Sequence, residues 1–187
     1  MLFRSALPAV LLVASVAQAT TLLRLDLPAL TRTSATVVRG TVKSSQARWT
    51  RDRSRIVTET IVTVRDTWKG ERLAEVSVLQ QGGVVGEVGQ LVHGTVTFKP
   101  GEEVALFLEA RGPGFLITGM MQGVFRIEGD VATQALEDDA HLLDPATQRP
   151  ETPQRLVLRV DALAAKVVGA AHAETPAPTG AGLRNRR

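Results

Sequence analysis

The hydrophobic pattern of the chain is dominated by one stretch, Arg55 to Thr67, in which Val, Ile and Thr predominate and no Gly or Pro occurs. β-branched side chains have restricted χ1 angles and pack well on a pleated surface, so this stretch predicts a long strand. Apolar residues occupy both odd and even positions, which indicates that both faces of the strand are covered. We therefore expect a central strand that closes with the turn Trp68-Lys69-Gly70.

The segments around the central strand predict further, shorter strands. Residues 35–43 alternate between apolar and polar types, and Gly40 in their middle is typical of a bulge or a tight bend. Residues 44–54 predict an exposed hairpin loop, and residues 82–89, with four glycines, predict a flexible connection. The remaining strands are expected at Leu73–Leu79, Leu91–Phe98, Val104–Leu108, Phe115–Met121 and Gly123–Glu128.

Helical segments are predicted on either side of this β-rich region. Residues 22–30 contain a short helical turn for which Asp26 is a suitable N-cap. Near the other end, four apolar residues are spaced as one stripe of a helix: Leu156, Val160, Leu163 and Val167. We expect this second helix to span residues 153–171, with Thr152 as its N-cap and Pro153 at its first position.

Together these elements favour a closed antiparallel barrel, because closure removes the exposed strand edges that promote aggregation. We predict a mainly β protein, a small antiparallel β-barrel of about five or six strands with a C-terminal helix. Residues 20–173 are long enough to bury one substantial hydrophobic core, so we expect a single domain.

The first 19 residues have the three parts of an export signal. Arg4 precedes a short apolar run, and the segment closes with the small-x-small sequence Ala17-Gln18-Ala19. We expect cleavage after Ala19 and a periplasmic or extracellular protein without a transmembrane segment; an uncleaved anchor is the alternative. At the other end, residues 174–187 are rich in Pro, Gly, Ala and Arg, which predicts a disordered basic tail.

Composition narrows the class of protein further. The chain contains no Cys, so it has no disulfide and no thiolate metal site, which favours a bacterial exported protein. The formal net charge is +3, but three of the arginines lie in the predicted tail, and residues 20–173 carry equal numbers of basic and acidic residues. A neutral domain lacks the basic face that binding to a phosphate backbone requires, so we expect no nucleic-acid partner.

The best candidate for a contact surface is an aromatic residue surrounded by arginines, in the predicted loop and at the first residue of the central strand: Arg48, Trp49, Arg51, Arg53 and Arg55. Guanidinium groups pair with carboxylates, and an indole ring stacks on a sugar or on a partner side chain. The pattern therefore indicates a protein or an acidic polysaccharide as the partner. The alternative is a solvated loop whose Trp49 packs back on the barrel.

Candidate catalytic and metal-binding residues are few. His93, His141 and His172 are widely separated, and neither H-E-x-x-H nor G-x-S-x-G occurs. His141 lies among acidic residues, so His141, Asp138 and Asp144 are candidate ligands for a cation, although we favour a solvated acidic loop. The glycines of residues 82–89 lack the Lys-Ser or Lys-Thr of a phosphate-binding loop. We expect no metal, no cofactor and no catalytic residues.

The order of four motifs resembles that of bacterial exported proteins of unknown function. These motifs are Ala-Thr-Val-Val-x-Gly-x-Val from Ala35, Trp-Lys-Gly from Trp68, Gly-Gly at Gly82 and Gly-Glu-Glu-Val-x-Leu-Phe-Leu from Gly101. Their layout is similar to the OB-like barrel of netrin-like domains and tissue inhibitors of metalloproteinases, over residues 35–128. The inhibitors act through an N-terminal Cys, whereas this chain would begin at Thr20 after cleavage, so no inhibitory residue carries over.

These observations predict an exported, non-catalytic binding module of the bacterial envelope or extracellular matrix. Such a module would be either a protease-inhibitor-like protein or a component of the envelope or matrix. The alternative is a secreted hydrolase whose site is assembled from residues that sequence patterns do not group.

Overall fold

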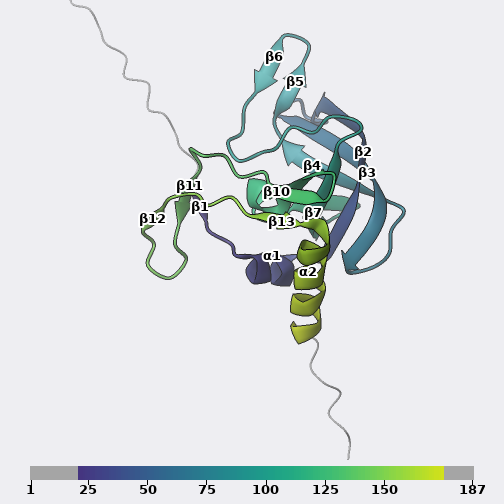
Figure 1. Cartoon of the computed structure of the whole chain (residues 1–187). Coiled ribbons are helices and arrows are strands. Elements are labelled where there is room, and N and C mark those ends of the chain that lie inside the picture. Colours follow the sequence, from purple (N-terminus) through teal and green to yellow (C-terminus); the bar gives the residue numbers. More distant parts are fainter. Residues whose placement is uncertain (1–20, 175–187) are drawn as a thin grey trace, which may run out of the picture.

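The computed structural model describes residues 21–174, in which β-strands are the main regular structure (Figure 1). Eight strands make one sheet in the order β13-β10-β9-β7-β2-β3-β4-β8. Their bounds are Thr36–Trp49 for β2, Ile56–Lys69 for β3, Glu75–Gln81 for β4, Glu103–Arg111 for β7, Gly114–Ile117 for β8, Val124–Glu128 for β9, Val131–Gln134 for β10 and Val157–Arg159 for β13. The predicted mainly β class is confirmed.

The pairings of five strands return to their starting point. β7, β2, β3 and β4 are antiparallel neighbours in that order, and β8 pairs antiparallel with β7. The ring is completed by a parallel contact of β4 with β8 at one residue pair, Val78 and Phe115. The second edge of β7 is shared, because residues 103–106 pair with β9 and residues 108–111 pair with β8. These five strands therefore form a ring of pairings within the sheet, and its description as an OB-like barrel stays a prediction.

The first helix, α1 (Leu27–Thr33), lies where the sequence predicts a helical turn. Asp26 is its N-cap, and the side chain accepts a hydrogen bond from the backbone N–H of Ala29 at 2.8 Å. Capping satisfies one of the free N–H groups at the helix start, and Pro in the first turn removes another.

The second helix, α2 (Val160–Glu174), begins later than expected. The predictions of Thr152 as its N-cap and of a start at Pro153 are wrong, because residues 157–159 form β13 and pair with β10. The four residues of the predicted stripe nevertheless pack in one core cluster. Leu156 reaches this core from an extended segment, which explains how a helical spacing arose outside the helix.

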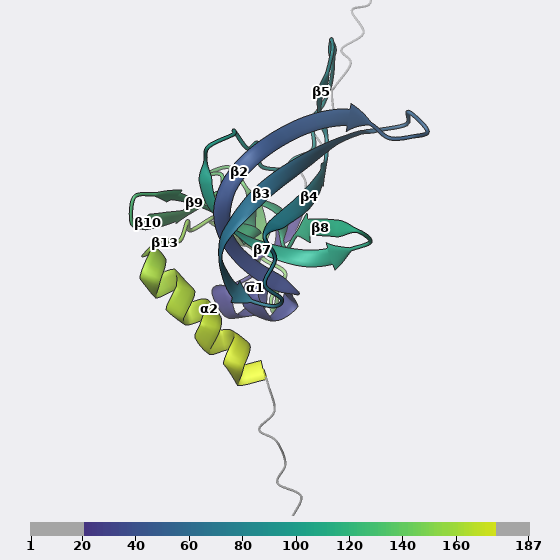
Figure 2. The ribbon, with the colours of Figure 1, turned by 90° about the vertical axis from the view of Figure 1, so that its right-hand side faces the viewer.

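Two hydrophobic clusters hold the fold together. The first lies inside the ring and includes Val38, Val62 and Leu106, all without exposed surface. The second lies between the outer face of the sheet and the two helices, and includes Val37 and Phe107 (Figure 2). Because neighbours in a strand point to opposite faces, β2 and β7 are buried on both sides. The predicted burial of residues 104–108 on both faces is confirmed.

The central strand is confirmed as β3, and its neighbour β2 is longer than predicted. The expected hairpin loop over residues 44–54 is confirmed for residues 50–54 and wrong for residues 44–49, which continue β2 and pair with β3. Register shifts occur between Arg39 and Gly40 and between Val42 and Ser44, so the predicted irregularity at Gly40 is confirmed. A Cβ at Gly40 would lie only 2.2 Å from the Thr63 carbonyl oxygen, and glycine therefore permits the close approach of the two strands.

The segment between β4 and β7 also differs from expectation. Residues 91–98 do not form a strand; instead the side chain of Gln80 holds Val96, donating to its carbonyl at 2.9 Å and accepting from its N–H at 3.2 Å. Residues 82–89 do not form an irregular connection, because they contribute to a two-stranded hairpin, β5 (Gly83–Val85) and β6 (Val88–Gln90).

A small three-stranded sheet was not predicted. It consists of β1 (Thr21–Leu23), β11 (His141–Leu143) and β12 (Pro150–Glu151). A short 3₁₀ helix, Met120–Gly123, replaces the end of a predicted strand. In the part of the chain that the structure describes, no helix is long and apolar enough to cross a membrane. The predicted signal peptide and nearly all of the predicted tail lie outside the described residues.

Candidate functional site

The strands β2 and β3 extend beyond the barrel as a long hairpin, which ends in residues 50–55, here called the distal loop (Figure 2). Thr50 N–H donates to the Arg55 carbonyl at 2.8 Å, and Arg53 N–H donates to the Thr50 carbonyl at 2.8 Å. Arg53 adopts a positive φ of 56°, which completes the turn. The distal loop is therefore held in one conformation by its own backbone.

A single carboxylate organises the distal loop. Asp52 accepts hydrogen bonds from Thr50 Oγ1 at 2.6 Å and from Ser54 Oγ at 2.8 Å. These bonds, with one from the Ser54 backbone, lower the pKa of Asp52 to about 2. Because hydroxyl groups of the loop satisfy this carboxylate, it does not engage the neighbouring arginines.

Three arginines project from this loop. Arg51, Arg53 and Arg55 are all exposed, and none forms an ion pair with another described residue. Arg48 behaves differently, because its Nη2 lies 3.7 Å from Glu59 Oε2, and Ser77 Oγ also donates to that carboxylate at 2.7 Å. Of the predicted arginine set, three side chains are thus free to meet an external acid.

Trp49 does not stand between these guanidinium groups. It is half-buried and lies opposite the fully buried Ile56 in the β2–β3 register. Arg48 precedes it in the same strand, so the two side chains point to opposite faces of the hairpin. The structure therefore divides the predicted surface, leaving the arginines of the distal loop together and turning Trp49 toward the inner face.

A second feature stands beside the distal loop, the β5–β6 hairpin of residues 83–90, here called the finger (Figures 1 and 2). Its base is tied to β3 by three hydrogen bonds. Gly82 N–H donates to the Ile56 carbonyl at 2.8 Å, Ile56 N–H donates to Gln90 Oε1 at 2.8 Å, and Thr58 Oγ1 donates to the Gly82 carbonyl at 2.7 Å. Since Ile56 directly follows Arg55, the finger rises next to the distal loop.

Glycine is required where the finger meets the hairpin. Gly83 has a φ of +127°, and a Cβ there would lie 2.4 Å from Thr58 Oγ1 and 2.8 Å from Ala47 Cβ. Both distances are far shorter than van der Waals contact, so only a residue without a side chain fits. This close contact fixes the base of the finger on the inner face of β2 and β3.

The finger carries exposed aliphatic side chains. Val84, Val88 and Leu91, which directly follows the finger, are 69%, 49% and 83% exposed. They are half of the six large apolar residues that stand exposed among residues 21–174. Single exposed apolar residues need no explanation, but a group of them on a projecting hairpin is typical of a contact surface. The sequence signal for this surface was a stretch of Val and Leu residues with Glu87 as its one charged residue. The glycines of the same stretch led instead to the prediction of a flexible connection.

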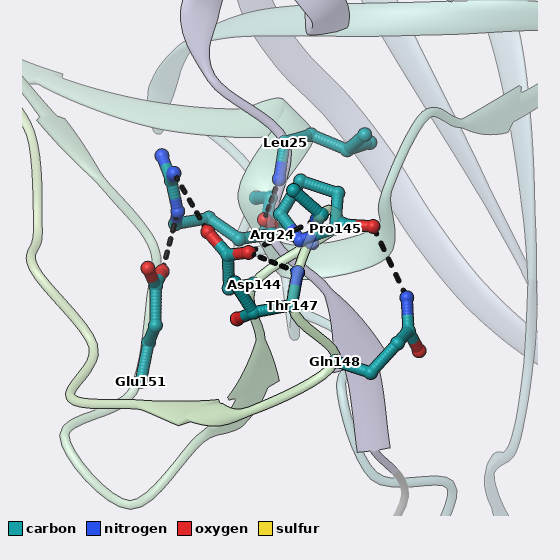
Figure 3. A network of polar contacts seen from close by, with 9 residues as sticks. Arg24, Leu25, Asp144, Pro145, Thr147, Gln148 and Glu151 are labelled. Carbon is teal, nitrogen blue, oxygen red and sulfur yellow. Dashed lines mark hydrogen bonds and ion pairs between the residues drawn. The ribbon is translucent and has the colours of Figure 1, made fainter.

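The candidate metal ligands are engaged in other interactions. Asp138 pairs with Arg155 at 2.9 Å, while Asp144 accepts from the backbone N–H of Thr147 at 2.6 Å and lies 3.8 Å from Arg24 (Figure 3). The bonds from Thr147, with that of Ala146 and the charge of Arg24, lower the pKa of Asp144. His141 is exposed at the start of β11. Within residues 21–174, no three His, Asp or Glu side chains are placed to hold a metal ion.

A cleft with a volume of about 770 Å³ lies between the small three-stranded sheet and the helices. Its two buried amides serve the backbone. Gln122 accepts from Leu25 N–H at 2.8 Å and donates to the Leu23 carbonyl at 3.0 Å, and Gln134 donates to the Gln122 carbonyl at 2.7 Å. In the described chain, no buried side-chain nitrogen or oxygen lacks a partner. The two buried amides of this cleft therefore stabilise the fold.

Comparison with known proteins adds no relative. No protein-family model matches the sequence, and a search of curated proteins returns no match. The resemblance to netrin-like domains therefore stays a prediction, and function has to be inferred from the distal loop and the finger themselves.

Proposed function

We propose that the protein is an exported, non-catalytic binding module of the bacterial envelope or extracellular matrix, and that it holds an acidic partner at the distal loop. The observation that carries this proposal is the state of Arg51, Arg53 and Arg55, which are exposed and without an ion pair among the described residues. Guanidinium groups bind carboxylates in a two-pronged geometry, so an acidic protein or polysaccharide suits them.

The stiffness of the distal loop supports the same function. Its turn is closed by backbone hydrogen bonds and by the Asp52 carboxylate, so little backbone freedom is lost on binding. Rigid projecting loops are common in protease inhibitors and other pre-organised binders, which keeps a protease-inhibitor-like role within this proposal. A hydrolase finds less support, since the three histidines are exposed and widely separated.

The test is a pair of variants with equal charge. The loop variant combines Arg51→Gln, Arg53→Gln and Arg55→Gln. The control variant makes the same change to Gln at three other exposed arginines that form no ion pair with a described residue: Arg72, Arg111 and Arg149. Both proteins are passed over immobilised polygalacturonate and immobilised poly-glutamate, and the salt concentration at elution is measured.

We expect the loop variant to elute at lower salt than the control variant. Both variants lose the same net charge, but only the loop variant loses the local cluster of arginines. The wild-type protein and the control variant should differ little. Equal elution of the two variants would show that overall charge governs retention and would refute the distal loop as the binding site.

A further inference from the structure

Building on the proposed function, we infer that the partner is a protein, and that the finger enters an apolar recess of this protein while the distal loop meets carboxylates at its edge. The finger offers aliphatic groups on both of its faces: Val84 lies opposite Gly89 and Val88 opposite Val85, so the two side chains point to opposite sides, and Leu91 follows directly. The distal loop adjoins Ile56, whose carbonyl accepts a hydrogen bond from Gly82 N–H at the base of the finger. A central apolar contact with a charged rim is the usual arrangement of a protein–protein interface.

The chemistry of the finger distinguishes a protein from a polysaccharide. Sugar rings are bound by stacking on aromatic side chains, and residues 82–91 contain no Phe, Tyr or Trp. Trp49, the aromatic residue closest in sequence to the distal loop, is half-buried on the inner face. Branched aliphatic side chains instead lose water most favourably against other aliphatic or aromatic side chains, which a protein supplies.

The charge distribution defines the partner further. Glu87 at the tip is the one charged residue of the finger, whereas Arg51, Arg53 and Arg55 belong to the distal loop, which adjoins Ile56 at the base of the finger. The complementary surface is therefore an apolar recess whose acidic groups lie on one side of it, toward the distal loop. A second copy of this chain fits less well, because a symmetric pair would bring two sets of these arginines to one interface, where like charges repel.

The attachment of the finger makes it suitable for insertion. The Gly83 contact and the bonds of Ile56 and Thr58 with residues 82–90 fix its base before any partner binds. The turn at its tip is open, since a Cβ at Gly86 would meet no atom within 4 Å. A projecting element that is already ordered retains more of its contact energy as affinity than a flexible one.

The experiment begins with a displayed library of random 16-residue peptides, selected on the immobilised wild-type protein. We expect the enriched peptides to combine Asp or Glu with Leu, Ile, Val or Phe. One enriched peptide is then synthesised, and its affinity is measured by fluorescence polarisation against three variants. These are the loop variant, a finger variant with Val84→Thr, Val88→Thr and Leu91→Gln, and a control with Val131→Thr, Val157→Thr and Leu23→Gln.

The control replaces the other three exposed apolar residues, so both triple variants make the same chemical changes. We expect the finger variant to bind the peptide at least 10-fold more weakly than the control, with its retention on polygalacturonate unchanged. The loop variant should lose most of the salt dependence of peptide binding. The single change Leu91→Gln, outside any strand, provides the same comparison if the triple variant proves unstable.

Each other outcome has a distinct meaning. Enriched peptides that are acidic without apolar residues, bound equally by the finger variant, would refute a protein recess and leave the proposed function standing. If the loop variant binds the peptide with the same affinity and the same salt dependence as the wild-type protein, the proposed function would be refuted instead. A wild-type dimer at micromolar concentration that the finger variant converts to monomer, measured by sedimentation, would show that the finger contacts a second copy and would also overturn the inference.

Discussion

The substitution Gly83→Ala tests how the finger is attached. A Cβ at this position would overlap Thr58 Oγ1 at 2.4 Å and Ala47 Cβ at 2.8 Å, and the φ of +127° is unfavourable for any residue with a side chain. Overpacking costs about 1–3 kcal/mol, and backbone strain of this kind costs about 1–3 kcal/mol. The chain can relieve both costs by detaching the finger from β2 and β3. The free energy of that detachment is therefore the upper limit on the destabilisation.

This upper limit is the stabilisation that the finger provides while it is packed on β2 and β3. Lifting it breaks the three bonds at its base, worth about 1 kcal/mol each, and uncovers Ile56, whose burial contributes about 2 kcal/mol. We therefore expect Gly83→Ala to shift local opening by about 2–5 kcal/mol, which is a rise of about 30- to 5,000-fold in the open population. The barrel itself should unfold at nearly the same urea concentration, since Ile56 belongs to neither core cluster.

Amide hydrogen exchange measures this opening directly. Protection of the peptide covering residues 82–90 should fall in Gly83→Ala, whereas the protection of β7 should be unchanged. Gly89→Ala is the matched control in the same finger, because a Cβ there would meet its nearest neighbour, Val84 Cγ2, at an ordinary 3.7 Å. Equal exchange of residues 82–90 in the two variants would refute the argument that the Gly83 contact attaches the finger.

Two further predictions concern the core and the loop. Val62→Asp or Leu106→Asp should unfold the domain, since both side chains are fully buried and an unpaired buried charge costs several kcal/mol; circular dichroism melting tests this. The lowered pKa of Asp52 means that its bonds stabilise the distal loop above about pH 4 and are lost as the pH falls from 3.8 toward about 2. The protection factor of the Ser54 amide, which corrects for the pH dependence of intrinsic exchange, should fall over that range, and Asp52→Ala should show the low protection factor already at pH 7.

The elements that the sequence predicted correctly are those whose local pattern agrees with their tertiary surroundings. β3 is a run of β-branched residues with partners on both sides, and β7 is apolar on both faces because it separates the two core clusters. Asp26 and Pro28 mark the start of α1 by a purely local mechanism. In these places, propensity, burial and hydrogen bonding favour the same structure.

The errors occur where backbone partners override the side-chain pattern. Residues 44–49 are mostly polar, yet β3 supplies their hydrogen-bond partners beyond the bulge. Residues 91–98 alternate like a strand, but the Gln80 side chain takes the place of a neighbouring strand at Val96. Leu156 continues a helical spacing from an extended segment, because both conformations reach the same core cluster.

The placement of the candidate contact residues was predicted in part for the same reason. Arg51, Arg53 and Arg55 lie in a true loop, so a composition argument identified them. Arg48 and Trp49 lie in a strand, where successive side chains point to opposite faces, so the two residues are separated. A prediction that places them in a loop does not include this alternation. The finger was missed because its glycines predict flexibility, whereas the contact of Gly83 with Ala47 and Thr58 depends on residues far away in the sequence.

Binding and stability are separable in this architecture because they depend on different parts of the β2–β3 hairpin. Val42 and Val62, which pair just before the bulge at Ser44, belong to the cluster inside the ring, and no residue between Ser44 and Ile61 belongs to either core cluster. The distal end is ordered instead by its own contacts, chiefly those of Asp52, Ile56 and Gly83. Replacing its exposed arginines removes none of these contacts. The free energy of unfolding of the loop variant should therefore lie within about 0.5 kcal/mol of the wild-type value. A loss of binding in that variant would then report on recognition and not on folding.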